Sequence, residues 1–296
     1  MSITLQASPL EATFHPDAGM IGSSLRRHGT ELLGQRQGLE AYRMSASTFG
    51  IPLLHPWANR LSRDGFAVAG VTVDLEAGDA PVTRDPGGLP IHGLAAASPY
   101  WRVASCDDQR AAAVLEWAEH DELMAGFPFP HELRMEVALD AGGLTVTTTL
   151  TATGDVAVPV AYGFHPYLAL PGVAREHYEI TLPVTRQAVL DERGIPTGAQ
   201  DDVTIAPANL GERTFDDLFV GLAGDRPEFV AEGGGRRLGV RFEEGFPFAQ
   251  VYAPPREAFV CFEPMTAPTN ALISGEGLRT VAPGSRDTTR FTITVA

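Results

Sequence analysis

The 296-residue chain has two cysteines, few basic residues and no long apolar run. Cys106 and Cys261 are too few for a disulfide framework or a zinc set, and no Asn-x-Ser/Thr sequence occurs. We expect both cysteines to be buried as small hydrophobic residues. The first residues lack a basic start followed by an apolar stretch, and no run approaches the roughly 18 residues of a membrane helix. These absences predict a cytoplasmic protein without a membrane segment.

Positive charge is also scarce, because 22 Lys and Arg residues face 37 Asp and Glu residues, for a net charge of −15. The resulting field repels nucleic acids and anionic membrane surfaces, so neither is an expected partner. Hydrophobic residues make up 44% of the chain and charged residues 20%, which is ordinary for a folded protein. The composition therefore predicts a globular protein that does not bind polyanions.

Sustained helical periodicity is missing as well, whereas short alternations of apolar and polar residues recur between Gly, Pro, Asp and Asn. In residues 131–152 the alternation reaches Asp140, the sequence Asp-Ala-Gly-Gly turns the chain, and the alternation resumes, which predicts a long hairpin. Threonines would form the outer face of its second strand. Further strand segments are predicted at 66–75, 111–120, 228–244, 248–254, 258–264 and 288–295.

No linker separates these predicted strands into groups, since 31 glycines and 23 prolines are spread evenly along the chain. A chain of this length can form one large all-β domain. We therefore expect an all-β fold in a single domain covering residues 1–296.

Several common catalytic motifs are absent, including G-x-S-x-G, a phosphate loop and a dinucleotide fingerprint. The sequence His-Glu-Leu-Arg-Met at 131–135 begins like a zinc-protease motif but lacks the second histidine. Polar residues beside Gly, Pro or aromatic residues are present instead. They lie in five segments that contain Asn59 and Arg60, His92, His165, Asp216 and Asp217, and Glu263.

These residue types fit the binding of a sugar, because they supply donors and acceptors for hydroxyls while aromatic neighbours cover C–H surfaces. A glutamate and a histidine could also divide proton removal from proton donation. The alternative is a structural role, since a lone histidine in an apolar strand is more often a core residue, and Arg60 or Asp216 alone fits a surface ion pair. Glu263 is the better candidate, because a carboxylate in Phe-Val-Cys-Phe-Glu-Pro is costly to bury without a partner or function.

Taken in order, the five segments resemble the aldose 1-epimerase, or galactose mutarotase, family from about Met20 to Arg290. The first segment resembles the family's Asn-Arg segment with its following Gly-x-Phe hairpin, where this chain reads Gly65-Phe66. The other matching features are a His-Gly segment ending in Trp, a His-x-Tyr motif, an Asp three residues before Phe, and a late Glu-Pro and Asn-Ala segment. The resemblance implies a large antiparallel β-sandwich. It also implies an enzyme that interconverts the α and β anomers of a free aldose, a small-molecule partner, with neither metal nor redox cofactor.

By this resemblance, His165 is the general acid and Glu263 the general base of ring opening. Ordinary pKa values of about 6.5 for His and 4.3 for Glu would place the donor and the base near neutral pH. Asp217 is the neighbouring alternative to Asp216, although it lies two residues before Phe219 instead of three. The residues expected to bind the sugar are Asn59, Arg60, His92, Tyr167 and Asp216.

The chain departs from the galactose-directed pattern Asn-His-x-Tyr-Phe-Asn, because it reads Phe-His-Pro-Tyr-Leu-Ala at 164–169. This difference weakens the expectation of a galactose preference. The sugar-phosphate branch of the family typically carries an arginine shortly after its His-Gly pair, where this chain has three alanines at 95–97. We therefore expect a neutral aldose, with Arg63, Arg84 and Arg102 as the basic residues that could substitute for the missing arginine.

Two other functions compete with this interpretation. A non-catalytic sugar-binding protein of the same fold would keep Arg60 and Asp216 but would not need both His165 and Glu263. A hexose-6-phosphate 1-epimerase would need a basic site for the phosphate. The sequence is compatible with a monomer or a homodimer.

Overall fold

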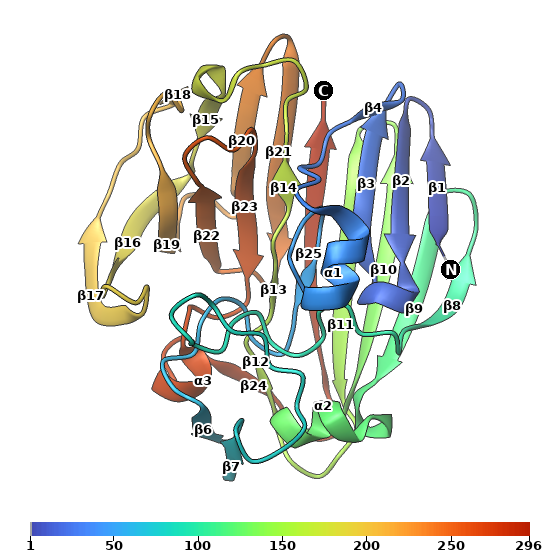
Figure 1. Cartoon of the computed structure of the whole chain (residues 1–296), viewed down its shortest axis with the longest axis vertical. Coiled ribbons are helices and arrows are strands. Elements are labelled where there is room, and N and C mark those ends of the chain that lie inside the picture. Colours follow the sequence, from blue (N-terminus) through green and yellow to red (C-terminus); the bar gives the residue numbers. More distant parts are fainter. Residues whose placement is uncertain (1) are drawn as a thin grey trace.

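A computed structural model describes residues 2–296, and antiparallel β-strands dominate it (Figure 1). The largest sheet has nine strands. In spatial order these are β18 (Ala208–Asn209), β15 (Glu179–Thr181), β20 (Glu228–Gly233), β21 (Arg236–Glu244), β25 (Arg286–Val295), β11 (Gly143–Ala152), β10 (His131–Asp140), β9 (Arg110–Glu116) and β8 (Arg102–Cys106).

A second sheet of eight strands carries the site described below. Its order is β17 (Pro196–Asp202), β16 (Val184–Leu190), β19 (Phe215–Leu222), β22 (Phe248–Ala253), β23 (Val260–Met265), β13 (Gly163–Phe164) and β5 (Leu53–Leu54), with β14 (Tyr167–Leu168) paired to β23. A four-stranded sheet contains β1 (Ile3–Ala7), β2 (Leu10–His15), β3 (Ile21–Arg27) and β4 (Thr30–Glu31). Two strand pairs remain, β6 (Gly65–Val68) with β7 (Val71–Asp74) and β12 (Val158–Val160) with β24 (Arg279–Val281).

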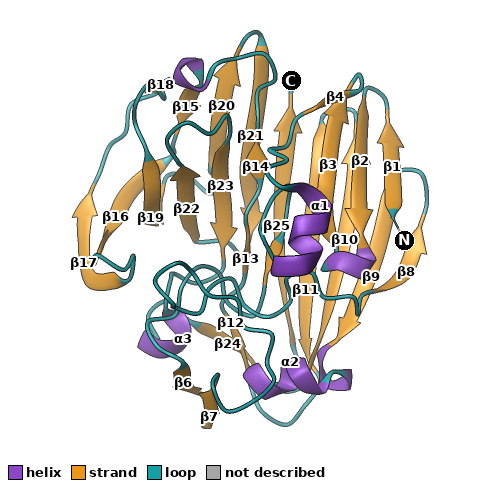
Figure 2. Ribbon diagram, in the orientation of Figure 1, coloured by secondary structure: helices purple, strands orange, loops and turns teal. Residues whose placement is uncertain are grey.

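Helices are short and lie between the strands, as the purple ribbons of Figure 2 show. The α-helices are α1 (Gly38–Ser45), α2 (Asp121–Gly126) and α3 (Ala271–Ser274), and the 3-10 helices are η1 (Pro16–Ala18), η2 (Trp117–Glu119) and η3 (Arg175–His177). Within residues 2–296, no helix is both long enough and apolar enough to cross a membrane.

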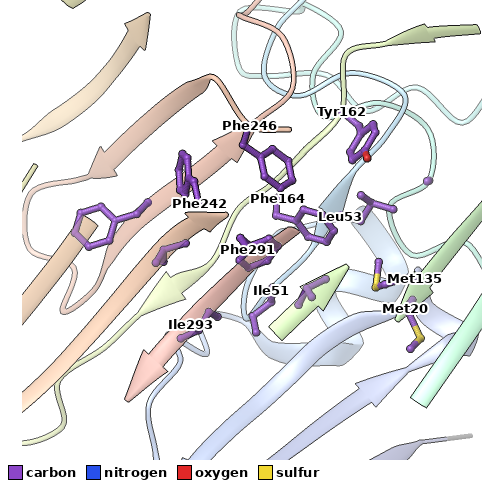
Figure 3. Packing of buried hydrophobic residues seen from close by; sticks show 14 of the residues in the cluster. Met20, Ile51, Leu53, Met135, Tyr162, Phe164, Phe242, Phe246, Phe291 and Ile293 are labelled. Atoms are coloured by element: carbon purple, nitrogen blue, oxygen red, sulfur yellow. The ribbon is translucent and has the colours of Figure 1, made fainter. Parts of the chain in front are cut away.

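Aromatic side chains join the nine-stranded sheet to the eight-stranded sheet. The rings of Phe229 on β20 and Phe262 on β23 lie 5.7 Å apart. Those of Phe164 on β13 and Phe291 on β25, both labelled in Figure 3, lie 4.9 Å apart. The four-stranded sheet packs on the other half of the large sheet, where β1 and β2 contact β10. The buried faces therefore form a layered core, and the predicted all-β sandwich is confirmed.

The predicted long hairpin is also confirmed, as β10 and β11. Leu133 pairs with Leu150 and Asp140 with Gly143, and the apolar residues of both strands are buried except Ala138, which is half-buried. Asp140 stabilises the turn, because its Oδ1 accepts hydrogen bonds from the amides of the two glycines at 142 and 143. The threonines on the outer face of β11 contact the neighbouring strand β25, where Thr145 Oγ1 lies 2.9 Å from Thr292 Oγ1, within hydrogen-bonding distance.

Some expectations need correction. The alternation at 66–75 was predicted as a strand segment, but these residues form the hairpin of β6 and β7, as the family resemblance implied, because Ala69 and Gly70 both adopt positive φ and reverse the chain. The predicted strand 111–120 ends at Glu116 and continues into η2. Cys261 is buried as expected, but the expectation for Cys106 was wrong. Cys106 lies on the edge strand β8, whose side chains are all exposed.

Candidate active site

One open pocket brings all seven candidate residues together, and it encloses about 770 Å³ of empty space including its mouth. Four of them come from the eight-stranded sheet or its connections, and three come from segments outside the named strands and helices. The candidate residues are Asn59, Arg60, His92, His165, Tyr167, Asp216 and Glu263. The remaining lining residues are Arg36, Thr48, Asp85, Pro86, Ile91, Gln250 and Tyr252.

The two-residue period of the central strands explains why polar side chains reach this pocket. Val251 on β22 and Phe262 on β23 pair with each other and belong to the apolar core between the sheets. Their neighbours Gln250 and Glu263 also pair with each other and point to the opposite face. A carboxylate inside an apolar strand is thus directed away from the core and into the pocket.

Because successive side chains of a strand point to opposite faces of the sheet, the two candidate aspartates on β19 point in opposite directions. Asp216 lines the pocket, and its Oδ1 accepts a hydrogen bond of 2.7 Å from Gln250 Nε2. The next side chain, Asp217, is not among the lining residues and instead accepts a hydrogen bond of 2.6 Å from Gln187 Nε2. The geometry therefore favours Asp216 over Asp217 as the residue that faces a ligand.

His165 and Glu263 form a close pair at the bottom of the pocket. His165 Nε2 lies 3.2 Å from Glu263 Oε1, and the two side chains are 7% and 2% exposed. The ring of Tyr167 stacks on the imidazole at 4.4 Å with an interplanar angle of 4°. The Tyr167 hydroxyl lies 3.4 Å from His165 Nε2. These contacts fix the imidazole with one nitrogen beside the carboxyl group.

Burial changes the protonation of this pair, so the expectation of ordinary pKa values is wrong. Burial, reinforced by the negative charge of Asp216, raises the pKa of Glu263 well above its usual range. Burial, followed by the charges of His92 and Arg36, lowers the pKa of His165 well below its usual range. Both shifts favour an uncharged pair, in which the carboxyl group holds the proton and the imidazole is neutral.

Arg60 is held in place by two neighbours. Its Nε donates a hydrogen bond of 2.7 Å to Asp85 Oδ2, and its Nη1 donates one of 3.2 Å to Asn59 Oδ1. Asp85 is itself fixed, because its Oδ1 accepts a hydrogen bond from the amide of Leu89. The sequence did not single out Asp85, and its Asp-Pro-Gly-Gly setting indicates only a turn.

The His-Gly pair has a steric explanation. His92 and Gly93 both have positive φ values, 63° and 74°. A Cβ atom at Gly93 would collide with the carbonyl of His55, which accepts hydrogen bonds from the amides of Leu94 and Ala95. A glycine is therefore required for the turn that brings His92 to the pocket. Burial, together with the nearby charge of Arg60, lowers the pKa of His92 to about 3.

Gln250 and Tyr252 of the pocket were missed from the sequence. Gln250 is buried, and its Oε1 has no hydrogen-bond partner among residues 2–296. A polar residue at an alternate position of the strand predicted at 248–254 was the available signal. The ring of Tyr252 is nearly perpendicular to that of His165, with centroids 5.8 Å apart.

Three arginines were considered from the sequence as basic residues that could bind a phosphate in place of the missing arginine, and all three lie outside the pocket. Arg84 forms an ion pair of 2.6 Å with Asp64, and Arg63 donates to the carbonyl of Gly65. Arg102 is exposed and lies 3.6 Å from Glu116. Arg36, from the loop between β4 and α1, lines the pocket instead. Within the described chain, no group of three or more His, Cys, Asp or Glu side chains is arranged to hold a metal ion.

Comparison with known proteins identifies the family of this chain. The family model described as aldose 1-epimerase matches residues 3–294. The chain belongs to the aldose 1-epimerase family. A protein of Escherichia coli K12 described as uncharacterized protein YihR is 27% identical over 247 residues, which cover 79% of this chain and 77% of that protein.

Solved structures of the family have the same fold. A galactose mutarotase-like protein from Clostridium acetobutylicum is 18% identical, with a TM-score of 0.85 over 100% of this chain and 95% of that chain. A putative aldose 1-epimerase from Escherichia coli K12 is 22% identical, with a TM-score of 0.80 over 100% of this chain and 99% of that chain. At these identities the likeness establishes a galactose mutarotase-like fold, and functional arguments depend on the residues of the pocket.

Proposed function

We propose that this protein is an aldose 1-epimerase that interconverts the α and β anomers of a free aldose by acid/base ring opening and closure. The observation that carries the proposal is the contact of 3.2 Å between His165 Nε2 and Glu263 Oε1 at the bottom of an open pocket. Arg60, His92 and Asp216 line the same pocket and supply hydrogen-bonding groups for hydroxyls.

In the proposed reaction, Glu263 removes the proton of the C1 hydroxyl while His165 protonates the ring oxygen. The C1–O5 bond breaks, and the product is the open-chain aldehyde. Rotation about the C1–C2 bond presents the other face of the aldehyde. In ring closure the O5 hydroxyl attacks the aldehyde carbon, His165 takes the O5 proton, and Glu263 gives its proton to the carbonyl oxygen, which becomes the new C1 hydroxyl. No proton is gained or lost overall.

The uncharged pair already holds the one proton that this reaction needs. Transfer of that proton from Glu263 Oε1 to His165 Nε2, across 3.2 Å, gives the carboxylate base and the imidazolium acid. Burial opposes this charge separation. A bound sugar offers hydroxyl groups that can hydrogen-bond to both charges, so substrate binding would favour the active protonation state.

The proposal is tested with freshly dissolved single-anomer sugars, followed by polarimetry or proton NMR with and without the protein. We expect the approach to anomeric equilibrium to accelerate in proportion to protein concentration for at least one aldose. Binding of an aldose without acceleration would contradict the proposal and would support a non-catalytic sugar-binding protein.

A further inference from the structure

Arg36 is a basic residue of the pocket without an acidic partner. Within residues 2–296 it forms no ion pair, whereas Arg60 in the same pocket is paired with Asp85 at 2.7 Å. Arg36 is exposed to the solvent that fills the pocket mouth. Its positive charge is therefore available to a ligand.

The guanidinium is nevertheless held in place. Arg36 Nη1 donates hydrogen bonds to the carbonyl of Thr48, at 3.1 Å, and to the hydroxyl of Tyr167, at 3.4 Å. Its Cζ lies 5.7 Å from the centroid of the Tyr167 ring, a cation–π arrangement. The backbone of Arg36 has a φ of 40°, a conformation that residues other than glycine rarely adopt. These features leave Nε and Nη2 without hydrogen-bond partners in the described chain.

Arg36 also lies close to the proposed general acid. The Tyr167 hydroxyl is 3.4 Å from Arg36 Nη1 and 3.4 Å from His165 Nε2. A positive charge at this distance opposes formation of the His165 imidazolium, which the proposed reaction requires. An anionic group bound by Arg36 would remove this penalty.

We propose that Arg36 binds an acidic exocyclic group of the substrate, so that the preferred substrate class is an anionic aldose. The inference rests on the proposed function, in which His165 protonates the ring oxygen. In a pyranose, C5 and its exocyclic carbon are attached next to that oxygen. An acidic group at C6 would therefore lie on the His165 side of the sugar, where Arg36 stands.

This inference replaces the neutral substrate expected from the alanines at 95–97. The net charge of −15 does not oppose it strongly, because salt screens charges beyond about 10 Å. A guanidinium within the pocket acts at hydrogen-bonding distance instead. Carboxylate and phosphate both match its planar geometry.

The test compares kcat/KM for glucose, glucuronate and glucose 6-phosphate in the wild type, in Arg36→Gln and in Arg110→Gln. Arg110 is exposed at the start of β9 and outside the pocket, so its substitution makes the same change in net charge. We expect the wild type to prefer an acidic sugar over glucose. Arg36→Gln should reduce that preference roughly tenfold to a hundredfold, the usual worth of a charge-assisted hydrogen bond, and Arg110→Gln should leave it unchanged.

A preference for glucose in the wild type, or equal preferences in the two variants, would overturn the inference while leaving the epimerase proposal intact. A preference for glucuronate alone or for the phosphate ester alone supports it and identifies the acidic group. Calorimetric binding of glucuronate and glucose tests Arg36 independently of catalysis. If no sugar is epimerised but Arg36→Gln selectively loses glucuronate binding, the epimerase proposal fails and the anion site stands.

Discussion

Two buried side-chain pairs in this protein contain histidine but have different surroundings. They are His55 with His131 in the core, and His165 with Glu263 in the pocket. In the core, His55 Nε2 lies 2.9 Å from His131 Nε2, and both residues are fully buried. In the pocket, His165 meets Glu263 at 3.2 Å, and its ring is nearly perpendicular to that of the half-buried His92, with centroids 5.7 Å apart. Burial lowers the pKa of each of these four histidines.

The core pair has a defined arrangement of protons. His131 Nδ1 lies 2.6 Å from the carbonyl of Phe129, which can only accept, so this nitrogen carries the hydrogen. In the neutral ring Nε2 is then an acceptor, and His55 Nε2 must donate to it. Trp117 stacks on His131 at 4.9 Å and closes the site. The comparison teaches that a lowered histidine pKa does not by itself identify a catalytic residue; an acidic partner and an open pocket do.

The largest expected difference between the two pairs is catalytic. His165→Ala should lower kcat by roughly 100-fold or more, because a positioned general acid usually contributes that much. His131→Ala should leave kcat of the folded protein within a few-fold of the wild type. The measurement is mutarotation of one aldose at saturating concentration, with folding checked by circular dichroism. Equal losses in the two variants would remove the distinction between the pairs.

The substrate-binding residues should show a different kinetic pattern. Arg60→Ala or Asp216→Ala should raise KM by about tenfold or more, the worth of a charge-assisted hydrogen bond, with a smaller effect on kcat. Asp217→Asn is the matched control for Asp216, since the neighbouring side chain is not among the pocket-lining residues. If KM rises as much in Asp217→Asn as in Asp216→Ala, the assignment of Asp216 as the aspartate on β19 that faces the ligand is wrong.

For the free energy of unfolding, we expect the core pair to be more sensitive to substitution than the pocket pair, the reverse of the expected effects on kcat. His131→Ala should lower the free energy of unfolding by roughly 3 kcal/mol, because it creates a cavity and leaves the Phe129 carbonyl and His55 Nε2 unpaired. His165→Ala should cost less, since solvent in the pocket can replace its contacts. Denaturant unfolding of both variants measures the difference. A smaller loss for His131→Ala than for His165→Ala would contradict the structural role of the core pair.

Acid should destabilise the protein through all four histidines. At pH below about 6.5 the unfolded chain binds protons that the buried histidines of the native state do not, so the unfolded state gains stability. The loss continues down to the lowered native values, about 4 for His131 and about 3 for His92. The raised pKa of Glu263 acts in the opposite direction, because its native carboxyl group keeps a proton above pH 4.5.

His15 also has a pKa lowered by burial, and the carboxyl groups of Asp217 and Glu116 also have raised pKa values. Five histidines with lowered pKa values against three carboxyl groups with raised ones predict that Tm falls between pH 7 and pH 5. Scanning calorimetry at these two values measures the change, and His131→Phe should show a smaller decrease than the wild type. A Tm that is constant or rises toward pH 5 would indicate that the histidines take up protons in the folded state.

Much of this arrangement could be predicted from the sequence, and the reasons are local. The alternation of residues 131–152 specifies a hairpin, because each side chain alternates between the core and the outer face. The order of the five polar segments indicated the family and thus all seven candidate residues. Gln250 was missed although its alternate position in the strand predicted at 248–254 was a signal, because the sequence does not show that this face of the strand opens into a pocket.

Other features depend on contacts between distant segments. The distances from Arg36 to Tyr167 and from Asp85 to Arg60 follow from loop conformations that residue types do not determine. The shifted pKa values of His165 and Glu263 likewise follow from burial in the assembled sheet. The sequence predicted that Cys106 would be buried, but the side chain is exposed. Its exposure results from the position of β8 at the edge of the nine-stranded sheet, which the sequence does not show.

The central claim is that the proton shared by Glu263 and His165 opens the sugar ring. Exchange spectroscopy by NMR on an aldose at anomeric equilibrium tests it most directly, with wild-type protein and Glu263→Gln compared at equal concentration. The wild type should exchange the anomers in proportion to its concentration, and Glu263→Gln, which keeps the shape but cannot act as a base, should be roughly 100-fold slower or more. Exchange by a correctly folded Glu263→Gln at the wild-type rate would contradict the claim.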